Sequence, residues 1–128
     1  MMQTLGIGAD ITECGRIARM LEQHRKSFTC RVFTERENDY CVGKQEISHY
    51  AGRWAAKEAI FKALDTGWLK GTSWRDIEIL NAPNGKPYVV LSGGMAEIAQ
   101  KKKIKEVQIS ISHCKSHAVA FAVAFGEG

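Results

Sequence analysis

The segment AVAFAVAF at residues 118–125 alternates alanine with larger apolar side chains. An apolar pattern with a period of two predicts a β-strand whose side chains point alternately to the two faces of a sheet. Because both faces are apolar, we expect both to be covered in the folded protein. One face carries Val119, Phe121, Val123 and Phe125, and the other carries only the alanines at 118, 120, 122 and 124. The small alanine face leaves room for a helix of the same chain or for a neighbouring subunit.

Other segments predict partners for this strand. Residues 107–112 alternate apolar and polar side chains, and the sequence HCKSH that follows predicts a turn into residues 118–125. The N-terminal LGIGADI predicts a short buried strand, in which Gly6 and Gly8 permit close approach of another backbone and Asp10 stands at the end. Ile77 to Ile79 and Tyr88 to Leu91 predict a hairpin that turns around Asn84-Gly85.

The remaining segments predict helices. One runs from Ile11 to about Phe28, with a core-facing stripe formed by Ile17, Met20, Leu21, His24 and Phe28. Thr34 and Glu37 have the spacing of a capping box, which marks the start of a second helix. A third begins near Ser48 and stops at Thr66-Gly67, and a short one covers MAEIAQKKK. We therefore predict an α+β fold in which residues 1–128 form a single domain of helices packed on a mainly antiparallel sheet.

The composition indicates which kinds of ligand and which cellular compartment suit this chain. The net charge of +4 is compatible with anionic ligands but too small to predict a nucleic-acid partner. The four cysteines form no C-x-x-C pair, the N-terminus lacks a secretion signal, and no segment approaches ~18 apolar residues. We expect a reduced, cytoplasmic protein without a membrane partner.

The helical segment AGRWAAKEAIFKALDTG at residues 51–67 places Glu58 and Lys62 within an otherwise apolar stripe. A solvated pair four residues apart is worth only ~0.2–0.5 kcal/mol and would need no further explanation. Here Trp54 and Phe61 flank the pair, and a desolvated charge requires a specific partner. A cleft or an interface fits this pattern better.

Asp10 and Glu58 predict a metal site if the strand end lies beside the helix. Two carboxylates at close range repel each other unless a proton or a cation lies between them. Mg²⁺ takes one or two protein carboxylates and completes its coordination with waters and phosphate oxygens. The alternative is that Asp10 caps the helix that follows it.

Basic residues on the same helix predict a phosphate ligand. Arg53, Lys57 and Lys62 accompany the acid, and this set suits a diphosphate or a nucleotide. His113, at a strand end, either donates to a phosphate or is a structural turn residue. We discount a zinc site there, and we assign the lysines at 101–103 and 105 to a solvated face.

Six motifs, taken in order, identify a family. GIGADITECGRI, FTERE, AGRWAAKEAIFKALDTG, DIEIL, NGKPYVVL and SISHCKSHAVA resemble the holo-[acyl-carrier-protein] synthases of the phosphopantetheinyl transferase superfamily across almost the full chain. The resemblance implies the 4′-phosphopantetheinyl transferase fold. It also implies a magnesium-dependent transfer of 4′-phosphopantetheine from coenzyme A to a serine of apo acyl carrier protein, with release of adenosine 3′,5′-bisphosphate.

The matching motifs imply roles for individual residues. Asp10, Glu58 and Lys62 would carry the reaction, with Asp10 and Glu58 as the Mg²⁺ ligands and Lys62 facing the diphosphate. Glu58 is also the natural base for the serine, directly or through a metal-bound water. Contacts to the remaining phosphates and the nucleotide would come from Arg53, Lys57, His113, Gly67 and Pro87.

The resemblance also implies partners. The acyl carrier protein is small, acidic and helical, so the basic ridge of Arg16, Arg19 and Lys26 is its expected docking surface. The same ridge could equally be a solvated helix face. The family implies a homotrimer with active sites between subunits, and a place in fatty acid and lipid biosynthesis. Two other hypotheses share some of these features, namely a magnesium-dependent nucleotide phosphohydrolase and a non-catalytic module that binds RNA or an acidic protein.

Overall fold

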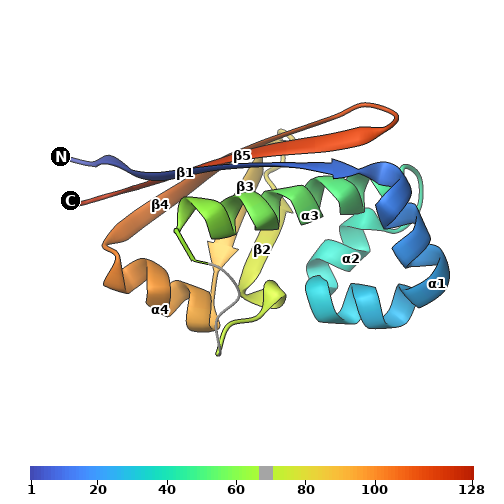
Figure 1. Ribbon diagram of the computed structural model, residues 1–128, viewed down its shortest axis with the longest axis horizontal. Helices are drawn as coiled ribbons and strands as arrows, with labels where there is room; N and C mark the ends of the chain where they lie inside the picture. The colour runs from blue at the N-terminus through green and yellow to red at the C-terminus, as the bar shows by residue number, and fades with distance from the viewer. Residues whose placement is uncertain (67–70) are drawn as a thin grey trace.

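The computed structural model describes residues 1–66 and 71–128. The chain begins with β1 (Gln3–Glu13), followed by the helices α1 (Cys14–Val32), α2 (Glu35–Cys41) and α3 (Glu46–Ala63). A short 3-10 helix, η1 (Trp74–Asp76), leads into β2 (Ile77–Asn81) and β3 (Pro87–Leu91). The chain ends with α4 (Gly93–Lys101), β4 (Ile104–His113) and β5 (His117–Gly126). Figure 1 shows α3 lying along one face of the sheet formed by β1, β5 and β4, with both termini at the same end.

Both sheets are antiparallel, which confirms the predicted α+β class. The larger sheet has the order β1-β5-β4, and β2 pairs with β3 in the smaller one. The hairpin turns at Gly85, whose φ of 90° lies in the left-handed region that glycine tolerates. β1 continues to Glu13, which pairs with His117 of β5, so the first helix begins at Cys14 and not at Ile11 as predicted.

The alanine face of β5 packs against α3 of the same chain. Ala118, Ala120, Ala122 and Ala124 are at most 1% exposed, and the last three share a core cluster with Ala55, Ala56 and Ala59 of α3. The alternative that a neighbouring subunit covers this face is therefore wrong. On β1, glycines face the same helix, because a Cβ at Gly8 would lie only 2.0 Å from the backbone oxygen of Ala59. The predicted close approach of two backbones is confirmed.

The opposite face of the sheet is exposed in the single chain. Ile7, Ile11 and Phe121 are 72%, 67% and 54% exposed. The register pairs Ala9 with Phe121, so these side chains lie on one continuous surface of β1 and β5. The prediction that both faces are covered is wrong for the chain alone, because only one face receives a helix.

Local hydrogen bonds and backbone angles set the start, the end and the kink of the helices. Thr34 and Glu37 form the predicted capping box at the start of α2. α3 ends at Ala63, earlier than predicted, because Asp65 adopts a left-handed φ of 52° and the Thr66 amide bonds back to the Phe61 carbonyl. α1 is kinked at His24, where φ is −140°. His24 is exposed, so it does not belong to the predicted core stripe.

Within residues 1–66 and 71–128, no helix is both long and apolar enough to cross a membrane.

Candidate active site

Three residues predicted to act together meet at the junction of β1 and α3. The Lys62 Nζ atom lies 3.4 Å from Asp10 Oδ1 and donates a hydrogen bond to the Ala9 carbonyl oxygen at 2.8 Å. Thr12 Oγ1 donates to the other carboxylate oxygen of Asp10 at 2.9 Å. Lys62 therefore reaches across to the strand, so it is not merely the solvated partner of Glu58.

Glu58 shares this electrostatic environment. Its half-buried position raises the pKa of its carboxyl group, and the negative charge of Asp10 raises it further, while Lys62 and Arg16 oppose the increase. The structure therefore brings Asp10 and Glu58 close enough to repel each other. The alternative in which Asp10 caps α1 is wrong, since the N-cap residue is Glu13 and α1 has no side-chain cap.

The donor set at this junction suits a hard cation. In the part of the chain that the structure describes, no three His, Cys, Asp or Glu side chains cluster as metal ligands. The protein would supply two carboxylates, which is the ligand number that Mg²⁺ typically takes from proteins when substrate phosphates and waters complete its shell. A cation would also relieve the repulsion between Asp10 and Glu58.

A second group of predicted residues lines a cavity of about 190 Å³ between α2, α3, the β2–β3 turn and β4. Arg53, Pro87 and His113 all face this cavity. The Arg53 guanidinium is held by Asn81 Oδ1 through Nη2 and lies 4.2 Å from the ring centre of Tyr40. Three residues predicted to contact the nucleotide or its phosphates are thus brought together.

This cavity contains two polar atoms without partners among the described residues. Arg53 is 4% exposed, and its Nε atom has no hydrogen-bond partner. The Nδ1 atom of His49, one helical turn earlier, is also buried and unpartnered. Buried polar groups are nearly always satisfied, so such atoms indicate a place for a water or for a polar group of a ligand. His49 was missed in the sequence, although its position four residues before Arg53 places it on the same helix face.

Lys57 does not belong to either site. It is 0% exposed, and its Nζ atom donates to Glu37 Oε1 at 2.8 Å and to the carbonyl oxygens of Val32, Trp74 and Ile77. Burial lowers the pKa of Lys57, and the charge of Glu37 opposes that decrease. The prediction that Lys57 contacts a phosphate is wrong, because its amino group already bonds four acceptors inside the protein.

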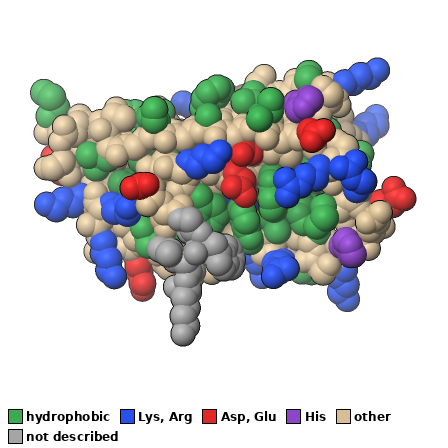
Figure 2. Space-filling model, viewed as in Figure 1, with side chains coloured by type: hydrophobic (Ala, Val, Ile, Leu, Met, Phe, Trp, Pro, Cys, Tyr) green, Lys and Arg blue, Asp and Glu red, His purple; other side chains and the backbone are tan. Residues whose placement is uncertain are grey.

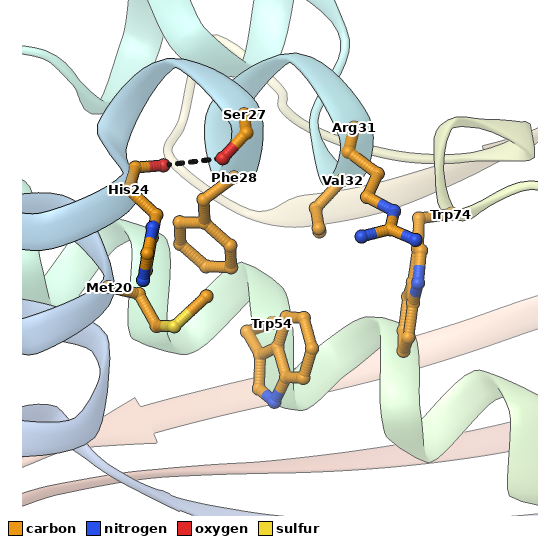
Figure 3. Close-up of a pocket in the computed structure, with 8 residues that line it drawn as sticks. All are labelled: Met20, His24, Ser27, Phe28, Arg31, Val32, Trp54 and Trp74. Atoms are coloured by element: carbon orange, nitrogen blue, oxygen red, sulfur yellow. Dashed lines mark hydrogen bonds between the residues drawn. The ribbon is translucent and has the colours of Figure 1, made fainter.

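A groove of about 590 Å³ lies between α1, α3 and η1. Figure 3 shows Met20 and Phe28 of α1 facing a space that Trp54 and Trp74 border, and the two indole rings stack with centres 4.8 Å apart. Trp54 lies one turn before Glu58 on α3, and the Arg16 guanidinium lies 5.7 Å from its ring centre. The sequence pattern placed Met20 and Phe28 in the core stripe, so the groove itself was not predicted.

The predicted basic ridge is only partly continuous. Arg16, Arg19 and Lys26 are all exposed on α1, but the kink at His24 separates Lys26 from the other two. Figure 2 shows acidic side chains in the middle of one face of the molecule, with basic side chains beside them and a hydrophobic patch below. Gly67, predicted to line the nucleotide pocket, lies outside the described residues.

The carboxylate site and the cavity lie on different sides of α3. Arg53 and Glu58 are five residues apart, which corresponds to ~140° around a helix and ~7.5 Å along it. Lys62 is nine residues from Arg53, and therefore ~180° around the helix. The charges that act on Glu58 are those of Asp10, Lys62 and Arg16, and Arg53 is not among them.

Comparisons with known proteins agree across nearly the whole chain. Residues 6–122 match the model of the 4′-phosphopantetheinyl transferase superfamily. A relative from Protochlamydia amoebophila, named holo-[acyl-carrier-protein] synthase, is 50% identical over 121 residues, which are 94% of this chain and 97% of the relative. The structure of the protein of that name from Neisseria meningitidis has a TM-score of 0.87 at 31% identity, over 95% of this chain and 98% of that one. The Helicobacter pylori protein in complex with coenzyme A has a TM-score of 0.82 at 34% identity, over 92% and 98% of the two chains.

Proposed function

The chain belongs to the 4′-phosphopantetheinyl transferase superfamily, and on that premise we propose how its own residues carry out the reaction. It is an enzyme that transfers the 4′-phosphopantetheine arm of coenzyme A to a serine of apo acyl carrier protein. The bond that breaks is the diphosphate linkage, so adenosine 3′,5′-bisphosphate leaves as the second product. The convergence of Asp10 and Glu58 carries the assignment of the reaction centre.

Asp10 and Glu58 would hold one Mg²⁺. Mg²⁺ held by these two carboxylates would supply electrostatic stabilisation of the negative charge on the diphosphate and on the transferred phosphoryl group. Thr12 keeps Asp10 oriented through its hydroxyl, and Lys62 balances the charge of Asp10. The side chain of Lys62 is 54% exposed, so its amino group can donate to a diphosphate oxygen without leaving Asp10. Glu58 is the group that would accept the serine proton, directly or through a water.

The cavity of Arg53, Pro87 and His113 would receive the nucleotide end of coenzyme A and its terminal phosphate. The unpartnered Nε atom of Arg53 supports this role, since it needs an acceptor. Because the cavity and the carboxylates lie on different sides of α3, a coenzyme A molecule that contacts both would run from the carboxylates of one chain to the cavity of its neighbour. We therefore propose active sites at subunit interfaces.

We propose a homotrimer, as the family resemblance implies, and the exposed sheet face supports association of chains. Ile7, Ile11 and Phe121 form an apolar surface that association would remove from water. Replacing Phe121 with aspartate should dissociate the assembly, which light scattering would detect, and should abolish transfer under conditions where the chain stays folded. A fully active Phe121→Asp monomer would contradict the interface site.

The acyl carrier protein would dock over the groove beside Glu58. Arg16 lies over the ring of Trp54, which lines this groove, and Arg19 is exposed on the same helix. Both charges would attract an acidic partner, and Lys26 adds charge beyond the kink. Met20, Phe28 and Trp54 offer the apolar contact that a helical partner needs. The serine of the carrier would then approach the carboxylates from the groove.

We further propose that the enzyme works in the cytoplasm and supplies fatty acid and lipid biosynthesis with holo carrier protein. The two other hypotheses are not favoured, because the family match covers most of the chain. A nucleotide phosphohydrolase would act without the carrier, and a basic RNA-binding module would bind RNA after Mg²⁺ had been removed by chelation.

The test is a mass measurement. Incubated with Mg²⁺, coenzyme A and an apo carrier, the enzyme should add one phosphopantetheine arm to the carrier. Asp10→Ala and Glu58→Ala should each abolish this addition, whereas Lys103→Ala, on the solvated basic face, should leave it intact. Unchanged turnover by both carboxylate variants would refute the proposed reaction centre.

A further inference from the structure

His49 occupies the cavity together with Arg53 and His113, on the opposite side of α3 from the carboxylates. Its ring packs against Tyr40 with centres 5.0 Å apart, and Tyr40 in turn lies beneath the Arg53 guanidinium. The Nδ1 atom is buried and has no partner among the described residues. The imidazole is therefore fixed in place by packing while one of its nitrogens remains unsatisfied.

The groups around His49 disfavour protonation of its ring. Burial lowers the pKa of His49, and the charges of Arg53 on α3 and His113 on β4 lower it further. From α2, Tyr40 packs on the ring, and a hydrogen bond to the backbone of Cys41 opposes the decrease in pKa. Protonation would put a third positive group beside two basic ones, with Nδ1 as a donor that lacks an acceptor.

We propose that His49 takes up a proton when a phosphate monoester enters this cavity, and that it is a further residue of the coenzyme A site. This inference rests on the proposed function, which places coenzyme A here. Coenzyme A carries one phosphate monoester, on the ribose, and its oxygens are acceptors only. A phosphate dianion between Arg53 and His113 would offset the positive charges that disfavour protonation of His49 and would supply an acceptor for the imidazolium.

The direction of the pH dependence of binding follows from the coupling between proton uptake and ligand binding. Because the bound state holds one more proton than the free state, affinity for the monoester rises as the pH falls, by at most ~10-fold per pH unit. The phosphate itself takes up a proton near pH ~6, which weakens its binding. The informative quantity is therefore the ratio of affinities between the native chain and a variant without His49, because the titration of the phosphate cancels in it.

The experiment measures binding of coenzyme A and of 3′-dephospho-coenzyme A by calorimetry from about pH 8 to about pH 6. For coenzyme A, the native protein should gain affinity over His49→Gln several-fold as the pH falls. For the dephospho compound, the ratio should stay constant. His117→Gln is the matched control, because His117 bonds Ser116 and lies outside this cavity. It should behave as the native protein does.

A second readout needs no variant. Near pH ~7, the binding enthalpy of coenzyme A should differ between buffers of different ionisation enthalpy, which reports proton uptake, and that difference should vanish for the dephospho compound. A pH-independent ratio, or proton uptake that His113→Gln removes and His49→Gln does not, would overturn the proposal. Loss of all coenzyme A binding by the native protein would instead refute the proposed function, so the two failures are distinguishable.

Discussion

Replacing Gly8 with alanine tests whether the close approach of β1 to α3 creates the reaction centre. The new Cβ would lie 2.0 Å from the Ala59 carbonyl oxygen, 2.8 Å from the Ala63 nitrogen and 2.9 Å from the Lys62 Cβ. Cβ atoms are essentially never found under 3.0 Å from such neighbours. Two of the three atoms belong to the backbone of α3, so no side-chain rotation can relieve the overlap.

The strand must therefore move away from the helix by about 1 Å, which costs ~1–3 kcal/mol or more of folding free energy. β1 pairs with β5 from Gln3 to Glu13, so the displacement is shared by its neighbours and carries Asp10 with it. A misplacement of ~1 Å can slow a reaction by ~10²-fold. We expect transfer to fall by about that factor at saturating coenzyme A, because Asp10 no longer meets Glu58.

Two measurements separate the loss of stability from the loss of transfer activity in Gly8→Ala. Urea unfolding gives the loss of stability, and transfer to the carrier is followed by mass at a temperature where circular dichroism shows the variant to be folded. Gly15→Ala is the matched control, because its Cβ would meet only the Arg19 side chain at an ordinary 3.7 Å. The Gly15→Ala variant should be ~0.5–1 kcal/mol more stable toward unfolding and should keep its activity.

Native-like stability together with near-native turnover in Gly8→Ala would refute this reasoning. A variant that loses stability but keeps turnover when folded would show that the spacing of β1 and α3 supports the fold without setting the geometry of the carboxylates. Gly6→Ala, whose Cβ would lie 1.8 Å from the Ala63 oxygen, should lose stability and transfer activity as Gly8→Ala does. This second variant tests whether the result depends on Gly8 alone.

Three further predictions concern the core and the docking surface. Lys57→Met should lower the free energy of unfolding by ~3–5 kcal/mol in urea titrations, because it leaves Glu37 buried without its partner; a loss under ~1 kcal/mol would contradict the structural role. Burial raises the pKa of Cys41 and of Tyr50 to about 12 in the folded state, from ordinary values of 9.0 and 10.0. Since both protons are held more tightly in the folded state, the contribution of these two groups to the unfolding free energy should be constant below about pH 9. The unfolding free energy should then fall as the pH rises toward 12, less steeply in Tyr50→Phe. Arg19→Glu should raise the KM for an acidic carrier at low salt, leave the KM for coenzyme A unchanged, and lose most of its effect at high salt in steady-state assays.

The spacing of apolar residues and the residue types at caps and turns made most helices and strands predictable from the sequence. The alternation at residues 118–125, the capping box of Thr34 and the turn at Gly85 each depend on local geometry, and the structure confirms all three. The covering of the alanine face could not be settled that way, because a helix of the same chain and a neighbouring subunit present similar apolar surfaces to a strand. The choice depends on tertiary packing, which only the structure shows.

The candidate site was predictable only where charge interrupts an apolar pattern. Glu58 and Lys62 stood out for that reason, and they do meet Asp10. Lys57 was predicted to contact a phosphate as a basic residue of the same helix, but it points into the core, where Glu37 and three carbonyl groups bind it. Residue type could not separate Lys57 from Lys62, because a basic side chain on a helix is either buried with protein partners or exposed toward a ligand.

Because Glu58 and Arg53 lie on different sides of α3, we expect the assembly of chains to affect the binding of coenzyme A. The helix packs against the sheet and also against α1 and α2, and it presents Glu58 and Arg53 at different places on its circumference. A single chain would then offer coenzyme A either the carboxylates or the phosphate cavity. If the exposed face of β1 and β5 joins neighbouring chains, both ends of the ligand gain contacts at once, and its affinity should rise with protein concentration as the assembly forms. A dilution series that shows parallel loss of assembly and of coenzyme A affinity would support this coupling, and constant affinity through dissociation would contradict it.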